Sequence, residues 1–77
     1  SGRSLLPVGV KSLQGNFMRG DMVACIDSNG TVIARGLVNY DVKEAQLIIR
    51  KSSDQIPSIL GYDGDHEIIH RDNLVLL

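Results

Sequence analysis

The sequence predicts one small, mostly β domain with two short helices near its middle. Apolar segments flank an Asn-Gly turn at residues 29–30, which is the strongest short signal for a β-hairpin. Apolar residues change to helical spacing after residue 41 and return to strand-like runs near residue 77. Strands that flank a helical pair and then close back on themselves predict a small barrel with helical plugs.

The first half of the chain is expected to supply most of the sheet. Leu5–Val10 is predicted as a short strand near an edge, because Pro7 interrupts it. Met22–Ile26 is a continuous apolar run, which predicts a strand buried on both faces. Thr31–Asn39 is the return strand of the hairpin, and Gly36 within it indicates a bulge or a close backbone approach.

The second half is expected to hold both helices and the closing strands. Asp41, followed three residues later by Glu44, has the spacing of a capping box and predicts a helix that runs to about Arg50. A second helix should begin near residue 53, accept a proline in its first turn and end at Gly61. Residues 67–70 and 73–77 are predicted as closing strands.

Composition limits the classes of function. The single cysteine, Cys25, excludes an intramolecular disulfide and suits a reducing, cytoplasmic setting, which is the expected localisation. No apolar run approaches the roughly 18 residues that span a bilayer, so no membrane partner is expected. The net charge of −1 argues weakly against general nucleic-acid binding. Because the chain begins without Met, residues 1–3 are expected to be a linker or a remnant and the chain a fragment.

Five motifs in order identify a resemblance. "SLLPVGV", "GNFMRGD", "IARGLVNYD", "ILGYDG" and "HRDNLVLL" resemble the PUA domain, from residue 4 to residue 77. The resemblance implies a small pseudo-barrel of the kind found in RNA-modifying enzymes. Among PUA domains, the motifs are most similar to the C-terminal domain of bacterial glutamate 5-kinases, which phosphorylate glutamate in proline biosynthesis.

This resemblance also implies what the chain lacks. The ATP-binding and Mg-binding kinase part of such an enzyme is absent from these 77 residues, together with its glycine-rich phosphate loops. We therefore expect no catalytic residues, no cofactor and no enzymatic activity in this fragment. A nucleophilic role for Cys25 is disfavoured because no paired base accompanies it. The "DGDHE" run lacks the spacing of a metal site, so no metal is expected.

The Arg-Gly-Asp triplet at residues 19–21 is interpreted as structural. Gly15 and Gly20 permit tight turns, Phe17 is expected in the core, and Asp21 leads into the buried strand. An integrin-type loop would need extracellular display, which nothing here suggests.

The tetrad at residues 70–73, His-Arg-Asp-Asn, imitates the catalytic loop of protein kinases. That loop needs an asparagine five positions after the aspartate, where this chain has Leu77. We expect His70 and Asp72 to order the turn into the last strand, with Asp72 or Asn73 bonding to backbone.

Four basic residues are the candidate RNA contacts. Arg35, Lys43, Arg50 and Lys51 occupy the segments that RNA-binding PUA domains use, by resemblance. They would neutralise phosphates and read helix shape. An ordinary charged helix face is the competing interpretation, and aromatic residues for base stacking are scarce.

Two functions follow from different classes. The first is an accessory domain that contacts its own kinase domain or neighbouring subunits and modulates activity or assembly. The second is a module that binds structured RNA, including a stand-alone module from an RNA-modifying enzyme. A third reading is a domain that keeps the fold without a ligand.

Overall fold

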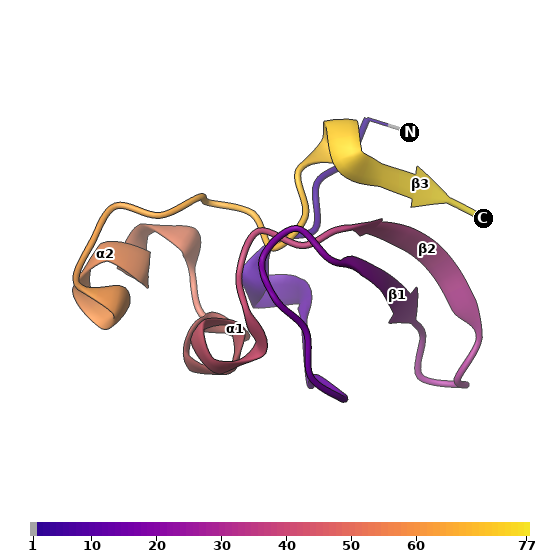
Figure 1. The fold of residues 1–77 in the computed structure, drawn as a ribbon, viewed down its shortest axis with the longest axis horizontal. Coiled ribbons are helices and arrows are strands. Elements are labelled where there is room, and N and C mark those ends of the chain that lie inside the picture. The colour runs from indigo at the N-terminus through magenta and orange to yellow at the C-terminus, as the bar shows by residue number, and fades with distance from the viewer. Residues whose placement is uncertain (1) are drawn as a thin grey trace.

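The computed structural model describes residues 2–77 and places a sheet at one end and two helices at the other (Figure 1). The strands are β1 (Met22–Ile26), β2 (Val32–Leu37) and β3 (Leu74–Leu76), and the helices are α1 (Val42–Ile48) and α2 (Ile56–Leu60). Three short 3-10 segments are η1 (Pro7–Gly9), η2 (Ser53–Gln55) and η3 (Arg71–Asn73). The predicted class, a mostly β PUA-like fold with two short helices, is confirmed.

The hairpin forms where the Asn-Gly signal predicts it. β1 and β2 pair antiparallel, and β3 adds antiparallel to the other side of β2. The turn uses a left-handed conformation only at Gly30 (φ 82°), whose N–H donates to the Asp27 carbonyl at 3.0 Å. The register shifts between Cys25 and Ile26, which leaves Ile33 as an extra residue in β2.

Gly36 marks a close approach, and the bulge lies elsewhere in the strand. A Cβ on this residue would lie 2.6 Å from the Asn73 carbonyl oxygen and 2.6 Å from Cγ2 of Ile69. The chain therefore crosses β2 at a distance that only glycine allows. Of the two predicted alternatives for Gly36, the structure selects the close backbone approach.

The predicted caps mark the start of α1 and the end of α2. The Asp41 carboxylate accepts the Glu44 N–H at 2.8 Å, which satisfies a free donor at the start of α1. Gly61 ends α2 with a φ of 83°. α1 is shorter than predicted and ends at Ile48, because the next residue, Ile49, is already extended with a ψ of 149°.

The core lies where the helices meet the inner side of the sheet. Its fully buried side chains include Tyr40, Ile48, Ile56 and Ile69. Phe17 packs against this cluster but is only partly buried, so its predicted place in the core is confirmed in part.

Three predictions of strands need correction. Leu5–Val10 is not a strand: Leu5 forms a single bridge with Ile69, and Pro7 then opens η1, because the φ that its ring fixes suits a helical turn. β1 is not buried on both faces, since its residues alternate between exposed and half-buried. Residues 67–70 contribute only the bridge at Ile69, so the closing strand is limited to β3.

Candidate functional site

Three of the four candidate RNA contacts lie on α1 or directly after it. Ala45 and Ile48 turn one face of α1 into the core and are fully buried. Lys43 therefore projects to the opposite side, and Arg50 and Lys51 follow the helix; all three are exposed. All three therefore lie at the helical end of the molecule.

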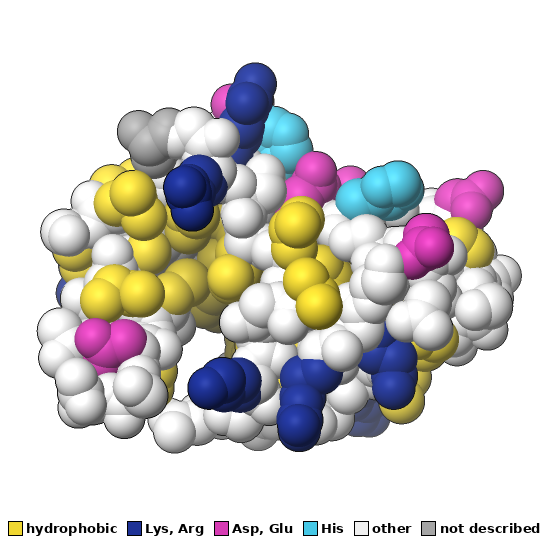
Figure 2. Space-filling view, turned by 180° about the vertical axis from the view of Figure 1, so that it is seen from behind, with side chains coloured by type: hydrophobic (Ala, Val, Ile, Leu, Met, Phe, Trp, Pro, Cys, Tyr) yellow, Lys and Arg dark blue, Asp and Glu magenta, His cyan; other side chains and the backbone are white. Residues whose placement is uncertain are grey.

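A fourth basic residue, Lys11, follows a segment that is tied to the end of α1. The Arg50 N–H donates to the Pro7 carbonyl at 2.7 Å and ties the end of α1 to η1. Lys11 follows η1 by two residues and is exposed. Figure 2 shows Lys and Arg side chains along the lower edge of the molecule with no Asp or Glu between them. We call Lys11, Lys43, Arg50 and Lys51 the basic edge.

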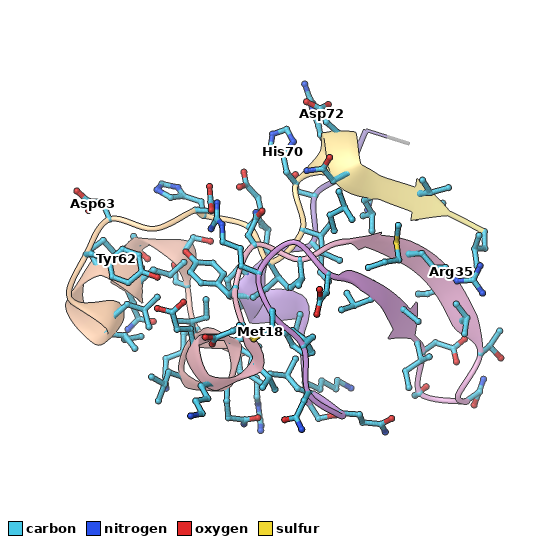
Figure 3. All side chains as sticks on the ribbon, in the orientation of Figure 1. Met18, Arg35, Tyr62, Asp63, His70 and Asp72 are labelled. Atoms are coloured by element: carbon cyan, nitrogen blue, oxygen red, sulfur yellow. The ribbon has the colours of Figure 1, made fainter. Side chains whose placement is uncertain are left out.

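Arg35 does not belong to the basic edge. It lies on β2, in register with Ala24 of β1 and Val75 of β3. Figure 3 shows its side chain on the sheet, away from α1. The four candidate RNA contacts therefore lie on two separate surfaces.

The arginine of the Arg-Gly-Asp triplet is a structural link that sequence reasoning missed. Its Nη1 donates to the Asn39 carbonyl at 2.6 Å and to Oδ2 of Asp65 at 2.8 Å. The Tyr40 hydroxyl donates to the Asp65 carbonyl. Arg19 thus ties the turn before β1 to the loop after α2, although no local sequence pattern predicts this contact between distant segments.

The other two residues of the triplet also serve the fold, as predicted. Oδ2 of Asp21 accepts the Met18 N–H at 2.8 Å, and the Asp21 carbonyl accepts the Val38 N–H at 3.0 Å. Gly20 has a φ of 90° and Gly15 a φ of 74°, values that favour glycine.

A tyrosine–carboxylate pair joins the two helices on the exposed side. The Tyr62 hydroxyl donates to Oε2 of Glu44 at 2.6 Å. This hydrogen bond, together with the negative charge of Glu44, raises the pKa of Tyr62 to about 12. Burial raises the pKa of Tyr40, and the nearby Asp65 adds to that effect. Both phenols therefore stay protonated at neutral pH, so they can act as hydrogen-bond donors but not as bases.

The turn into β3 is ordered by His70 instead of by the carboxylate or amide that follows it. Nδ1 of His70 accepts the Asp72 N–H at 3.1 Å and caps η3. The prediction that Asp72 or Asn73 would make the side-chain contact to backbone is wrong, because the preceding imidazole already satisfies this donor. His70 and Asp72 are nevertheless part of the turn that was predicted for them.

Neither a metal-binding cluster nor an activated thiol is found among the described residues. Residues 2–77 contain no group of three or more His, Cys, Asp or Glu side chains that could hold a metal ion. Cys25 is half-buried, and burial raises the pKa of its thiol, which disfavours the nucleophilic thiolate. Among the helices of residues 2–77, none has the length and apolar character needed to cross a bilayer.

An open groove of about 1230 Å³ runs between β1 and residues 9–17. Its lining includes Val10, Leu13 and Val23, with Ile68 and Ile69 of the core. Met22, Ala24, Ile26 and Ile33 also line it, so the groove reaches both sides of the edge strand β1. Figure 2 shows this hollow with apolar side chains inside it.

The chain belongs to the PUA domain family, whose sequence profile matches residues 1–60. Along almost all of its length it is also similar to bacterial glutamate 5-kinases. It is 60% identical over 76 residues to glutamate 5-kinase of Nitrosospira multiformis and 62% identical over 76 residues to that of Hahella chejuensis, covering 99% of this chain in both cases. The identity to glutamate 5-kinase of Pseudomonas entomophila is 58% over 77 residues. The chain spans only 20% or 21% of the length of these curated relatives.

Proposed function

We propose that this chain is the accessory PUA domain of a glutamate 5-kinase and that it modulates the activity or assembly of that enzyme. The observation that carries the proposal is the identity of 58% to 62% with glutamate 5-kinases along 97% to 100% of the chain. On this proposal, ATP, Mg and glutamate bind to the larger part of the enzyme. The partners of the domain are then its own kinase domain and neighbouring subunits.

The chemistry of the described residues supports an accessory role. Its tyrosines are held protonated, its cysteine thiol is disfavoured as a thiolate, and no metal-binding cluster is present among residues 2–77. The hydrogen bonds of its polar side chains connect segments of the fold to one another, as the Arg19–Asp65 pair does. Such groups maintain a shape that another surface can recognise.

Removal of the domain tests this function. The full-length enzyme should be compared with a version that ends before residue 4 of this chain. We expect a change in the kinetics with glutamate, in feedback inhibition or in oligomer size measured by light scattering. Identical values for all three properties would refute the accessory role.

RNA binding is the second candidate, and the basic edge favours it. Lys43, Arg50 and Lys51 lie on α1 or directly after it, and Lys11 follows a segment that is hydrogen-bonded to Arg50. Figure 2 shows Lys and Arg side chains gathered along one edge. Such a cluster suits the phosphates of a structured RNA, with little recognition of sequence. The net charge of −1 does not oppose it, because the charge is distributed unevenly.

A titration with a stem-loop RNA tests the basic edge. Lys43→Glu and Lys51→Glu should each weaken binding at low salt and reduce the slope of log K against log salt by about 0.7 to 0.9. Arg71→Glu, a charge reversal on exposed η3, is the matched control and should have a smaller effect. Equal losses in all three variants, or no binding at low salt, would refute an RNA site on this edge.

A further inference from the structure

The outer side of the sheet is apolar and open. Residues of antiparallel strands that lie opposite each other project to the same face, so the register defines which side chains share it. The large apolar residues of this face are Met22, Ile26, Ile33, Leu37 and Val75, with exposed fractions of 64%, 47%, 47%, 39% and 62%. We call these five residues, with Ala24 and Arg35, the outer sheet face.

Arg35 is the one charged side chain of the outer sheet face and lies at its centre. It is on the middle strand, between Ala24 on one side and Val75 on the other. Among the lysines and arginines of residues 2–77, the one found within ion-pair distance of a carboxylate is Arg19, so Arg35 has no carboxylate partner within the described chain. A guanidinium surrounded by apolar side chains is complementary to a surface that presents a carboxylate within an apolar patch.

The size of the face limits what can cover it. The strands have five, six and three residues. With about 3.3 Å for each residue and 4.8 Å between strands, they present roughly 220 Å². A stable complex of separate proteins usually buries about 800 Å² on each partner. A face of this size is sufficient when the partner is already tethered in the same chain, because the tether supplies a high effective concentration.

A second copy of this domain does not suit the face. A two-fold axis through its centre would place Arg35 of one copy against Arg35 of the other, and like charges repel. RNA does not suit it either, since one cation among five apolar side chains offers little to a phosphate backbone. The charge pattern and the size both favour an apolar, carboxylate-bearing partner within the same enzyme.

We propose that the outer sheet face is the surface by which this domain docks onto the larger part of its own enzyme, against an apolar patch whose carboxylate pairs with Arg35. The inference rests on the proposed function and specifies the contact that would transmit the modulation. It separates this docking surface from the basic edge, which lies at the helical end.

The two methionines of the chain provide an internal comparison. Met22 lies on the outer sheet face and is 64% exposed, whereas Met18 lies in the turn before β1 and is 67% exposed. Equal exposure predicts similar oxidation rates if nothing covers either sulfur. Figure 3 shows Met18 near α1, away from Arg35.

Oxidation of the full-length enzyme with hydrogen peroxide, followed by peptide mass spectrometry, tests the proposal. If the domain is docked for about 90% of the time, Met22 should be oxidised about tenfold more slowly than Met18, because it reacts only in the undocked state. Arg35→Glu should repel the carboxylate and bring the two rates within about twofold of each other. Lys43→Glu is the matched charge reversal on the basic edge and should preserve the protection of Met22.

Similar rates for the two methionines in the unaltered enzyme would overturn the proposal. Protection of Met22 that survives Arg35→Glu would also overturn it, since the charge pair would then play no part. Slow oxidation of Met18 together with fast oxidation of Met22 would also overturn it, because the domain would then dock through another face. That result would leave the accessory role intact. The accessory role itself fails only if removal of the domain changes nothing, so the two failures are distinguishable.

Discussion

Gly36→Ala should be the most damaging single-methyl change in the sheet. The added Cβ would lie 2.6 Å from the Asn73 carbonyl oxygen and 2.6 Å from Cγ2 of Ile69. The Ile69 side chain is fully buried, and Asn73 is held by the hydrogen bond from its N–H to the His70 carbonyl at 2.8 Å. Neither neighbour can move without disturbing the turn into β3.

The expected loss of stability follows from two opposing terms. Overpacking of a well-packed site costs about 1–3 kcal/mol, and a contact with backbone lies toward the upper end. Replacing glycine by alanine recovers about 0.4–1 kcal/mol through the lower entropy of the unfolded chain. We therefore expect a net loss of about 2 kcal/mol, which corresponds to a decrease in Tm of about 8–16 °C for a domain of this size.

Urea denaturation of the 77-residue chain, followed by circular dichroism, measures the effect. Gly9→Ala is the matched control, because nothing lies within 4 Å of its added Cβ and its φ is not positive. This control should change the free energy of unfolding by less than about 1 kcal/mol. A loss for Gly36→Ala within about 0.5 kcal/mol of the control would refute the crowding argument, since ordinary surface changes fall within that range.

Three further results are expected. Asp41→Ala should lower the free energy of unfolding by about 1 kcal/mol in the same urea assay, and Asp41→Asn should restore most of it, because the amide oxygen can still cap α1. Absorbance at 295 nm should show that neither tyrosine ionises at its usual pH near 10, and Glu44→Gln should lower the pKa of Tyr62 from about 12. Since the folded pKa of Tyr62 is raised, its contribution to stability is fully present below pH 10 and is lost between pH 10 and about 12.

Much of the fold follows from local sequence signals. Met22 and Ile26 bound an apolar run between two aspartates, and β1 has those bounds. The Asp41 cap and the Gly61 terminus are equally local, since each depends on a residue type that suits one backbone position. Local signals fail at Pro7, where the restricted φ fits a 3-10 turn as well as an edge strand.

The candidate surfaces depend on contacts that local patterns do not encode. The hydrogen bond between Arg50 and Pro7 ties the segment that precedes Lys11 to the end of α1, although the two segments are far apart in sequence. The position of Arg35 depends on the register of three strands, and that register was not predicted. Sequence reasoning identified the basic residues but not their separation into two surfaces.

Because the basic residues lie on two separate surfaces, the net charge of the chain is a poor guide to whether it binds RNA. A value of −1 argues against RNA only if the charge is spread evenly, and Figure 2 shows basic side chains gathered along one edge. An isolated arginine on an apolar face has a different use from lysines on a polar edge, because desolvation strengthens its pairing with a single carboxylate. Lys43→Glu should therefore affect RNA binding without exposing Met22, and Arg35→Glu should expose Met22 without affecting RNA binding. If either variant altered both properties, the two surfaces would act as one site and the division drawn from the sheet register would be wrong.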